Sequence, residues 1–281
     1  NNIMAIGEMA FMKENGYGMP MNKEEAEKIY LQLAEERDDE WSMIKLAYIE
    51  MDRGNSEERL KWIQKALEKE YIDAYFELGF FYQFDEAYKD LEKAQQSYYQ
   101  AAQLGNPDGM NGLALIYYNM PDYKGDEQAF RWFSKSADLG DSLGLYYLAV
   151  MYENGFGTNV DKQKAWDLYL ASSDQKFSPA YRKIAQLIEE GEAPASFTGR
   201  ELEYYIKAAE RNDIDAIHDV IRFLENDPDR QKELFSWCQR GAQLNDGKCI
   251  CKLGKLYFYG MGTEMDEFKA MNCFRKAETM E

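Results

Sequence analysis

The sequence predicts an all-α fold, a right-handed α/α superhelical solenoid of about eight helix-turn-helix repeats. Three observations predict it. A small residue recurs late in each repeat at intervals of 33 to 36 residues, each repeat has two segments of helical apolar periodicity, and three turns share one glycine pattern. One helical hairpin cannot bury its own apolar face, so repeats of this length are expected to stack on their neighbours.

The late position defines the repeats. It is small in six of the eight, and its residues are Ala34, Leu67, Ala102, Ala137, Ser173, Ala209, Ala242 and Glu278. We expect residues 1–281 to form a single array, with repeats at approximately 1–37, 38–70, 71–105, 106–140, 141–176, 177–212, 213–245 and 246–281.

The first helix of each repeat has a small residue followed four positions later by an apolar residue and then another small one. Gly144, Leu148 and Ala149 show the pattern. The second helix has a bulky pair just before the late position, such as Trp132 and Phe133. Spacings of three and four residues place these side chains on one face of a helix, so we interpret them as packing positions.

Glycine-rich turns connect the two helices in three repeats. Residues 14–18 match residues 153–157, and 259–262 repeat the theme. Glycine tolerates the positive φ that a tight reversal after a helix requires. The next helix is expected to begin after the N-cap residues Asn22, Asp161 and Asp266, with Glu25 completing a capping box. No strand precedes these glycines and no GK[ST] follows them, which argues against a phosphate-binding loop.

The composition indicates a folded, acidic protein. Hydrophobic residues make up 45% of the 281 residues, aromatic residues 15%, and the net charge is −18. Such a field repels nucleic acid and anionic lipid and favours a basic partner. No apolar run approaches the ~20 residues that span a bilayer. No signal peptide or initiator Met is present, so we expect a trimmed piece of a longer protein, which leaves its compartment open.

The sequence predicts no catalytic residues, no metal site and no cofactor. The cysteines Cys238, Cys249, Cys251 and Cys273 lack CxxC spacing, and we interpret them as core thiols, with one disulfide left open. His218 is the one histidine and is interpreted as an ordinary helical residue. Neither GxSxG nor HExxH occurs.

The stretch from Leu148 to Tyr169 is similar to the Sel1-like repeat, a relative of the tetratricopeptide repeat. Its Leu-Ala, Tyr152, Gly-x-Gly, Asp161 and Lys-Ala positions follow the family signature LGxxYxxGxGVxxDxxKAxxWYxKAA, and repeats one, five and eight match best. Arg59 departs from it by replacing the alanine of Lys-Ala in the second repeat.

The resemblance implies an adaptor that holds protein partners. It also implies a bacterial periplasmic or secreted location over a cytoplasmic one. A cysteine-rich branch of the family is linked to β-lactam binding, but six of the eight repeats here contain no cysteine, which argues against that activity.

In such arrays the first helix of each repeat lines the concave face. If so, the predicted partner-binding residues are Tyr48, Phe76, Phe80, Phe84, Leu115, Tyr118 and Tyr146. Repeat six becomes polar there, with Arg182 and Gln186. The alternative is that these aromatic residues pack on the next repeat and close the groove. The variants Phe80→Glu and Tyr118→Glu test this. If the groove is open, both should abolish partner capture without unfolding the chain. If the aromatic residues are packed, both should lower thermal stability strongly.

The sequence therefore favours a non-catalytic scaffold or adaptor that binds a protein or peptide, laid along the aromatic strip. One alternative is a hydrolase or carbohydrate-active protein with its site in the groove, which would need an exposed acid or His pair within hydrogen-bonding reach. Another is a structural spacer in a bacterial envelope or secretion assembly, which a groove filled by its own side chains would favour.

Overall fold

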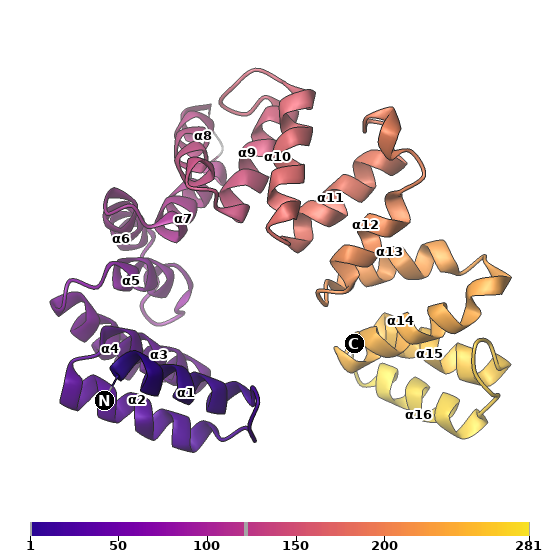
Figure 1. The fold of residues 1–281 in the computed structure, drawn as a ribbon, viewed down its shortest axis with the longest axis horizontal. Coiled ribbons are helices and arrows are strands. Elements are labelled where there is room, and N and C mark those ends of the chain that lie inside the picture. Colours follow the sequence, from indigo (N-terminus) through magenta and orange to yellow (C-terminus); the bar gives the residue numbers. More distant parts are fainter. Residues whose placement is uncertain (1, 121–122, 281) are drawn as a thin grey trace. The chain divides into compact units, whose positions relative to one another are not determined.

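The protein is described by a computed structural model that covers residues 2–120 and 123–280. Within those residues the chain forms sixteen α-helices and two short 3-10 helices, with no strand (Figure 1). The α-helices are α1 (Ile3–Asn15), α2 (Lys23–Arg37), α3 (Glu40–Asp52), α4 (Ser56–Glu68), α5 (Ile72–Phe84), α6 (Leu91–Gln103), α7 (Pro107–Tyr118), α8 (Tyr123–Asp138), α9 (Ser142–Asn154), α10 (Lys162–Asp174), α11 (Ser178–Glu189), α12 (Glu201–Ala209), α13 (Ile214–Leu224), α14 (Gln231–Gln243), α15 (Gly247–Tyr259) and α16 (Glu267–Glu278). The 3-10 helices are η1 (Ala195–Phe197) and η2 (Pro228–Arg230).

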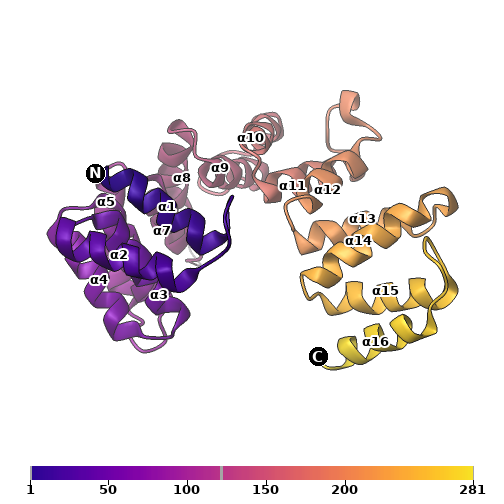
Figure 2. The ribbon, with the colours of Figure 1, turned by 60° about the horizontal axis from the view of Figure 1, so that its bottom comes forward.

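Consecutive helices pack as hairpins. The pairs α1–α2, α3–α4, α5–α6 and α7–α8 are in contact, as are α11–α12, α13–α14 and α15–α16, and α15 and α16 lie side by side in Figure 2. Hairpins of the same unit also contact one another, for example through α6 and α7 in unit 1 and through α12 and α13 in unit 2. The predicted all-α fold of stacked helix-turn-helix repeats is confirmed.

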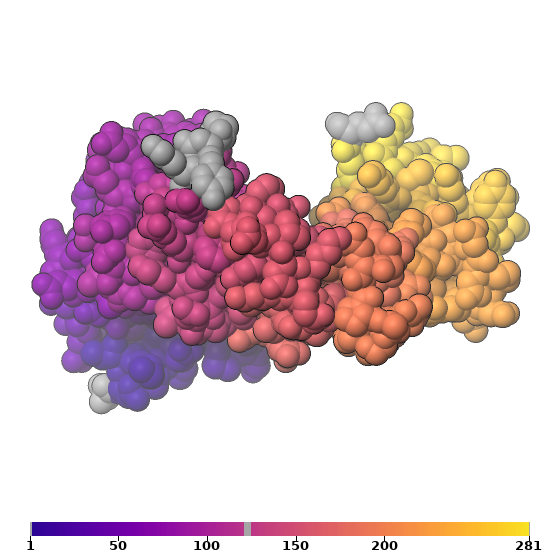
Figure 3. Space-filling view, turned by 90° about the horizontal axis from the view of Figure 1, so that it is seen from above, coloured from indigo at the N-terminus to yellow at the C-terminus, as the bar shows by residue number. Residues whose placement is uncertain are grey.

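The hairpins form two compact units. Unit 1 comprises Asn1–Gly144 with Phe156–Thr158, and unit 2 comprises Leu145–Gly155 with Asn159–Glu281. In each unit the surface colours of Figure 3 follow one another in sequence order, so that each hairpin adjoins its neighbours in the chain. The expectation of one array over the whole chain stays a prediction.

The core of unit 1 is built from large side chains set against small ones. Tyr98 of α6 is almost fully buried, and it fills the space left by Gly79 of α5 and Gly112 of α7. A Cβ atom would lie 2.5 Å from the Tyr98 ring at Gly79 and 2.7 Å from it at Gly112. The small positions of the first helices are therefore needed so that an aromatic ring can enter between two hairpins.

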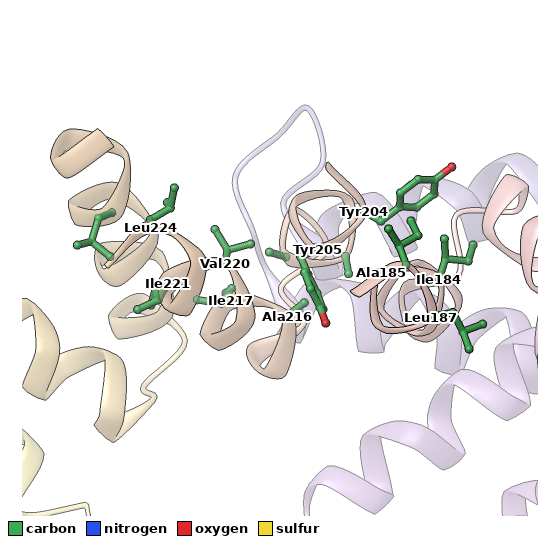
Figure 4. Packing of buried hydrophobic residues seen from close by; sticks show 14 of the residues in the cluster. Ile184, Ala185, Leu187, Tyr204, Tyr205, Ala216, Ile217, Val220, Ile221 and Leu224 are labelled. Atoms are coloured by element: carbon green, nitrogen blue, oxygen red, sulfur yellow. The ribbon is translucent and has the colours of Figure 1, made fainter. Parts of the chain in front are cut away.

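The core of unit 2 follows the same plan. Figure 4 shows Tyr204 and Tyr205 of α12 in one buried cluster with Ile184 and Ala185 of α11 and Ile217 of α13. Side chains from consecutive hairpins thus share one interior, as the repeat period predicts.

The predicted turn chemistry is confirmed. The side chains of Asn22, Asp161 and Asp266 each accept a hydrogen bond from the backbone N–H three residues later, and Gly16 and Gly155 have positive φ. In the capping box, Glu25 accepts from the Asn22 side-chain amide at 3.2 Å, rather than reaching its backbone.

The second glycine of two of these turns has a further reason to be glycine. A Cβ atom at Gly157 would lie 2.4 Å from the backbone oxygen of Asp126, and one at Gly262 would lie 2.1 Å from that of Gln231. The turn therefore touches the second helix of the preceding hairpin, and only glycine permits that approach.

Candidate functional site

Three phenylalanines spaced four residues apart form a continuous strip along α5. The ring centroids of Phe76 and Phe80 are 6.4 Å apart, and those of Phe80 and Phe84 are 4.7 Å apart. Phe76 and Phe80 are half-buried, whereas 57% of Phe84 is exposed. We call these three residues the α5 aromatic stripe. A helical spacing of four aligns them, because residues at i and i+4 lie on one face.

The stripe rests on buried side chains from the neighbouring helices. The ring of Phe76 lies 5.7 Å from that of Tyr98. The guanidinium of Arg59, from α4, lies 5.6 Å from the ring centroid of Phe80 and 5.3 Å from that of Phe81, which places it in cation–π contact with both. Phe76 and Phe80 therefore pack on side chains of neighbouring helices, whereas Phe84, at the end of the stripe, is exposed to solvent.

Two charged residues are buried beside the stripe. Arg59 is 3% exposed and Glu77 is 5% exposed. The Nε and Nη2 atoms of Arg59 have no hydrogen-bond partner, and burial lowers the pKa of this guanidinium. Burial also raises the pKa of the Glu77 carboxyl, although the hydrogen bond donated by the Tyr48 hydroxyl and the charge of Arg59 oppose that rise. Each charge is thus the counter-charge of the other in a poorly hydrated setting.

Acidic side chains of unit 1 lie at the start of three successive first helices. Asp73 is in the first turn of α5, Asp108 is in the first turn of α7, and Asp141 caps α9. Asp108 lies at the surface, yet partial loss of water raises the pKa of its carboxyl, and repulsion from Asp141 and Asp73 raises it further. Three carboxylates that repel one another are a site to which positive charge is attracted.

The other predicted site residues have different surroundings. Tyr48 is half-buried and donates its hydroxyl hydrogen to Glu77, so it adjoins the stripe. Leu115 is half-buried on α7. Tyr118 faces Phe133 at 6.5 Å and Phe156 at 6.1 Å, so it packs on a second helix and a turn.

Tyr146 lies in unit 2. Its ring is 5.6 Å from that of Tyr169 and 5.5 Å from that of Phe177. The structure therefore brings Phe76, Phe80 and Phe84 together with Tyr48, and it places Tyr118 and Tyr146 against other rings.

The corresponding face of unit 2 is ionic. Arg182 of α11 donates to Asp219 at 2.9 Å and to Asp215 at 3.0 Å. Arg222 of α13 donates to both carboxylate oxygens of Glu189, at 2.8 and 2.9 Å. This face satisfies its own charges across two hairpins, as the polar residues of repeat six suggested.

An acid–histidine pair does occur, in unit 2. Nε2 of His218 lies 2.8 Å from Oδ1 of Asp246, which also accepts from the backbone N–H of Cys249 at 2.7 Å. Burial works to raise the pKa of Asp246, but these hydrogen bonds outweigh it, so the pKa is lowered. His218 precedes Asp246 by 28 residues, and the signal that could have paired them is the repeat itself, because His218 lies in one first helix and Asp246 caps the next.

That pair has a structural counterpart in unit 1. Asn111, at the same position of α7, donates to Oδ1 of Asp141 at 2.6 Å, and Asp141 accepts from the N–H of Gly144. Both aspartates cap the next first helix and tie it to the hairpin before it. A helix cap that is joined to its neighbour therefore explains the His218–Asp246 pair without catalysis.

A cavity of about 520 Å³ lies in unit 2, away from the stripe. Asn212, Trp237 and Arg240 are among the residues that line it. Arg240 is already engaged there, because it donates to Asn212 at 3.0 Å and to the backbone oxygen of Glu210 at 2.6 Å. We therefore do not assign the candidate surface to this cavity.

The Sel1 repeat model matches residues 3–38, 72–106, 107–141, 142–177, 202–213 and 247–280. No curated protein matches the sequence. The hairpins α3–α4 and α13–α14, together with helix α11, lie outside the matched segments, although they pack in the same way.

Solved structures of similar fold include two bacterial proteins. A Sel1 repeat protein from Oxalobacter formigenes has 20% identity and a TM-score of 0.66, with coverage of 99% of this chain and 82% of that one. A protective antigen of uropathogenic Escherichia coli strains, c5321, which displays an SLR fold, has 23% identity and a TM-score of 0.57, with coverage of 98% and 68%. Because the family model matches more than half of the residues, this chain belongs to the Sel1 repeat family.

Proposed function

We propose that this protein is a non-catalytic scaffold that binds a basic protein or peptide segment, and that the α5 aromatic stripe is the anchor point. Sel1 repeats are typical of protein-interaction scaffolds. The observation that carries the proposal is the stripe itself, whose rings touch one another and end in the exposed Phe84. Large rings with few rotatable bonds are effective anchors, because they bury much apolar area at a low cost in side-chain entropy.

Charge supports a basic partner. The net charge is −18, and Asp73 and Asp108 lie close enough to Glu77, beside the stripe, to raise the pKa of its carboxyl. A lysine or arginine brought near Asp108 would relieve the repulsion that raises its pKa. We therefore expect the partner to combine an apolar side chain for the stripe with nearby positive charge, and to bind faster at low salt.

The remaining predicted residues differ in how close they lie to the stripe and in how far they are packed. Tyr48 holds Glu77 beside the stripe, and Leu115 extends the apolar surface toward α7. Tyr118 and Tyr146 are held by rings of their own unit, so they contribute packing as well as surface.

Among the helices of residues 2–120 and 123–280, none combines the length and the apolar character that a membrane span requires.

Selection of short random peptides from a display library on the immobilised protein tests the proposal. We expect enriched peptides to carry Lys or Arg beside an aromatic or branched aliphatic residue. Phe84→Ser should weaken a selected, synthesised peptide by at least about tenfold in fluorescence anisotropy, because loss of an aromatic anchor costs more than about 1 kcal/mol.

Phe268→Ser is the matched control. Phe268 of α16 is 75% exposed and lies in unit 2, so its loss removes a comparable exposed ring elsewhere. Both variants should keep the helical circular dichroism of the parent. The proposal fails if no peptide is enriched over an unrelated acidic protein, or if the two variants bind the selected peptide equally well.

A further inference from the structure

Three side chains with metal-binding atoms meet at the start of α15. They are His218 of α13, the N-cap residue Asp246, and Cys249 in the first turn of α15, and one ligand atom from each lies within 4.8 Å of the others. His218 and Asp246 are half-buried and Cys249 is buried. Each has a fixed place, because Asp246 caps the helix and also holds the His218 ring at 2.8 Å.

The matched cap in unit 1 shows what is special here. There the same three positions are occupied by Asn111, Asp141 and Gly144, with the same pattern of hydrogen bonds to the aspartate. The cap therefore requires neither an imidazole nor a thiol. In unit 2 both of the other positions have changed to side chains that bind metal ions, while the aspartate is kept.

We propose that His218, Asp246 and Cys249 form a binding site for one Zn²⁺ ion. A thiolate, an imidazole and a carboxylate are the donors that zinc prefers, and three protein ligands leave a fourth position for water or another ligand. Tetrahedral coordination at Zn–N and Zn–S distances of about 2.0–2.3 Å places ligand atoms about 3.5 Å apart. Small rotations of His218 and Asp246 would bring the atoms to that spacing.

The surroundings give the ion a route and a balanced charge. A cavity of about 210 Å³ beside the site is lined by His218, Cys249, Glu225 and Lys252, with Ile221, Arg222 and Lys248. Two of the three lysine and arginine side chains that line this cavity are neutralised, because Lys252 pairs with Glu225 and Arg222 pairs with Glu189. The third, Lys248, is exposed.

Zinc binding would release the thiol proton of Cys249. Burial raises the pKa of this thiol, and its hydrogen bond to Asp246 raises it further, so the proton is retained in the absence of metal. The ion must displace it to bind a thiolate.

Titration with Zn²⁺ in competition with a chromophoric chelator tests the site on the whole chain. We expect one ion per chain, and His218→Asn to weaken it by at least about tenfold, since even outer-shell changes at zinc sites cost that much. This variant inserts the residue that the chain itself uses at position 111, so the cap hydrogen bond and the fold are retained. Cys249→Ala should weaken zinc binding to the same extent. Its fold should be retained, because Ala216 occupies the corresponding position of α13.

Cobalt substitution and a second pair of variants complete the test. Co²⁺ should give the intense visible bands of tetrahedral coordination and a near-ultraviolet thiolate band, and Cys249→Ala should remove the latter. Cys251→Ser and Cys273→Ser remove thiols outside the cluster and should leave both signals unchanged. Absence of a stoichiometric ion in the parent protein, or equal binding in His218→Asn and the parent, would overturn the proposal.

Discussion

Helices α5 in unit 1 and α13 in unit 2 occupy the same place in their hairpins, yet their exposed faces differ in chemistry. Nine residues after the N-cap, α5 carries Phe80 and α13 carries Arg222. Six residues after it, α5 has the buried Glu77 and α13 has Asp219, which is bonded to Arg182. The face of α5 carries aromatic rings beside buried charges, whereas the face of α13 carries a network of ion pairs near the surface.

The difference shows which positions of the repeat are set by the fold. The small residue three after the N-cap is Ala74 in α5 and Ala216 in α13, because both must let a neighbouring helix approach. The positions six and nine after the N-cap carry no such constraint, so their side chains vary, with Glu77 and Phe80 in α5 and Asp219 and Arg222 in α13. In unit 2 these side chains bind one another, whereas the stripe of unit 1 ends with a ring in solvent, which is why we place the partner there.

The largest effect that separates the two faces should come from the acid six residues after the N-cap. Glu77→Ala removes the acidic group that most favours the buried Arg59 charge, leaving only the weaker effect of Asp85, and it removes the acceptor of the Tyr48 hydroxyl. We expect a loss of about 3–5 kcal/mol in the free energy of unfolding. Asp219→Ala, at the same position of unit 2, should cost about 1 kcal/mol or less, because Arg182 keeps Asp215 and the pair is close to water.

Urea denaturation followed by circular dichroism measures both variants. Glu77→Gln is the control, since it keeps an acceptor for the Tyr48 hydroxyl while removing the charge. Its free energy of unfolding should lie between those of the parent protein and Glu77→Ala. Equal losses for Glu77→Ala and Asp219→Ala would mean that the buried pair is no more important than the surface network.

A second, smaller contrast runs along the stripe itself. Phe80→Ala should cost about 1–2 kcal/mol, because this half-buried ring contacts Phe76, Phe84 and Arg59. Phe84→Ala should change stability by less than about 0.5 kcal/mol, as should Gln186→Ala at the position of α11 that corresponds to Phe80. Thermal unfolding of the three variants checks the gradient, and a large loss in Phe84→Ala would show that the stripe is packing throughout.

This gradient also bears on the glutamate variants that the sequence suggests. Phe80 and Tyr118 both touch other rings, so Phe80→Glu and Tyr118→Glu would combine loss of surface with loss of packing. The exposed Phe84 separates the two effects more cleanly. Whether a residue is surface or core depends on rings of other helices, such as Phe133 and Phe156 around Tyr118, which the spacing along one helix does not reveal.

Local features were predictable from the sequence because they depend on residues a few positions apart. The caps at Asn22, Asp161 and Asp266, and the positive φ of Gly16 and Gly155, follow from turn chemistry alone. The period likewise predicted stacked hairpins.

Features that depend on contacts one repeat apart were not predictable in the same way. Arg59 was visible only as a departure from alanine, and its burial under Phe80 and Phe81 follows from the next hairpin. His218 and Asp246 each looked ordinary, and only the packing of the α13–α14 hairpin against α15 brings them to 2.8 Å.

The smallest contrast concerns one aspartate at the start of each first helix. Asp108 and Asp215 both lie two residues after an N-cap, but Asp108 faces Asp141 and Asp73, whereas Asp215 pairs with Arg182 at 3.0 Å. Because its pKa is raised in the folded state, Asp108 lowers stability above that pKa, and the penalty disappears as pH falls below it. Asp108→Asn should therefore stabilise the protein at neutral pH by no more than about 0.5 kcal/mol, since solvent screens the carboxylate. The gain should vanish in acid, where Asp108 is protonated in both the folded and the unfolded state.

Asp215→Asn should change stability in the opposite direction, with a loss of about 0.2–1 kcal/mol at neutral pH, because it removes an attraction instead of a repulsion. Urea midpoints of the two variants at neutral and acidic pH measure both signs, and a shared sign at neutral pH would show that the two faces do not differ in charge balance.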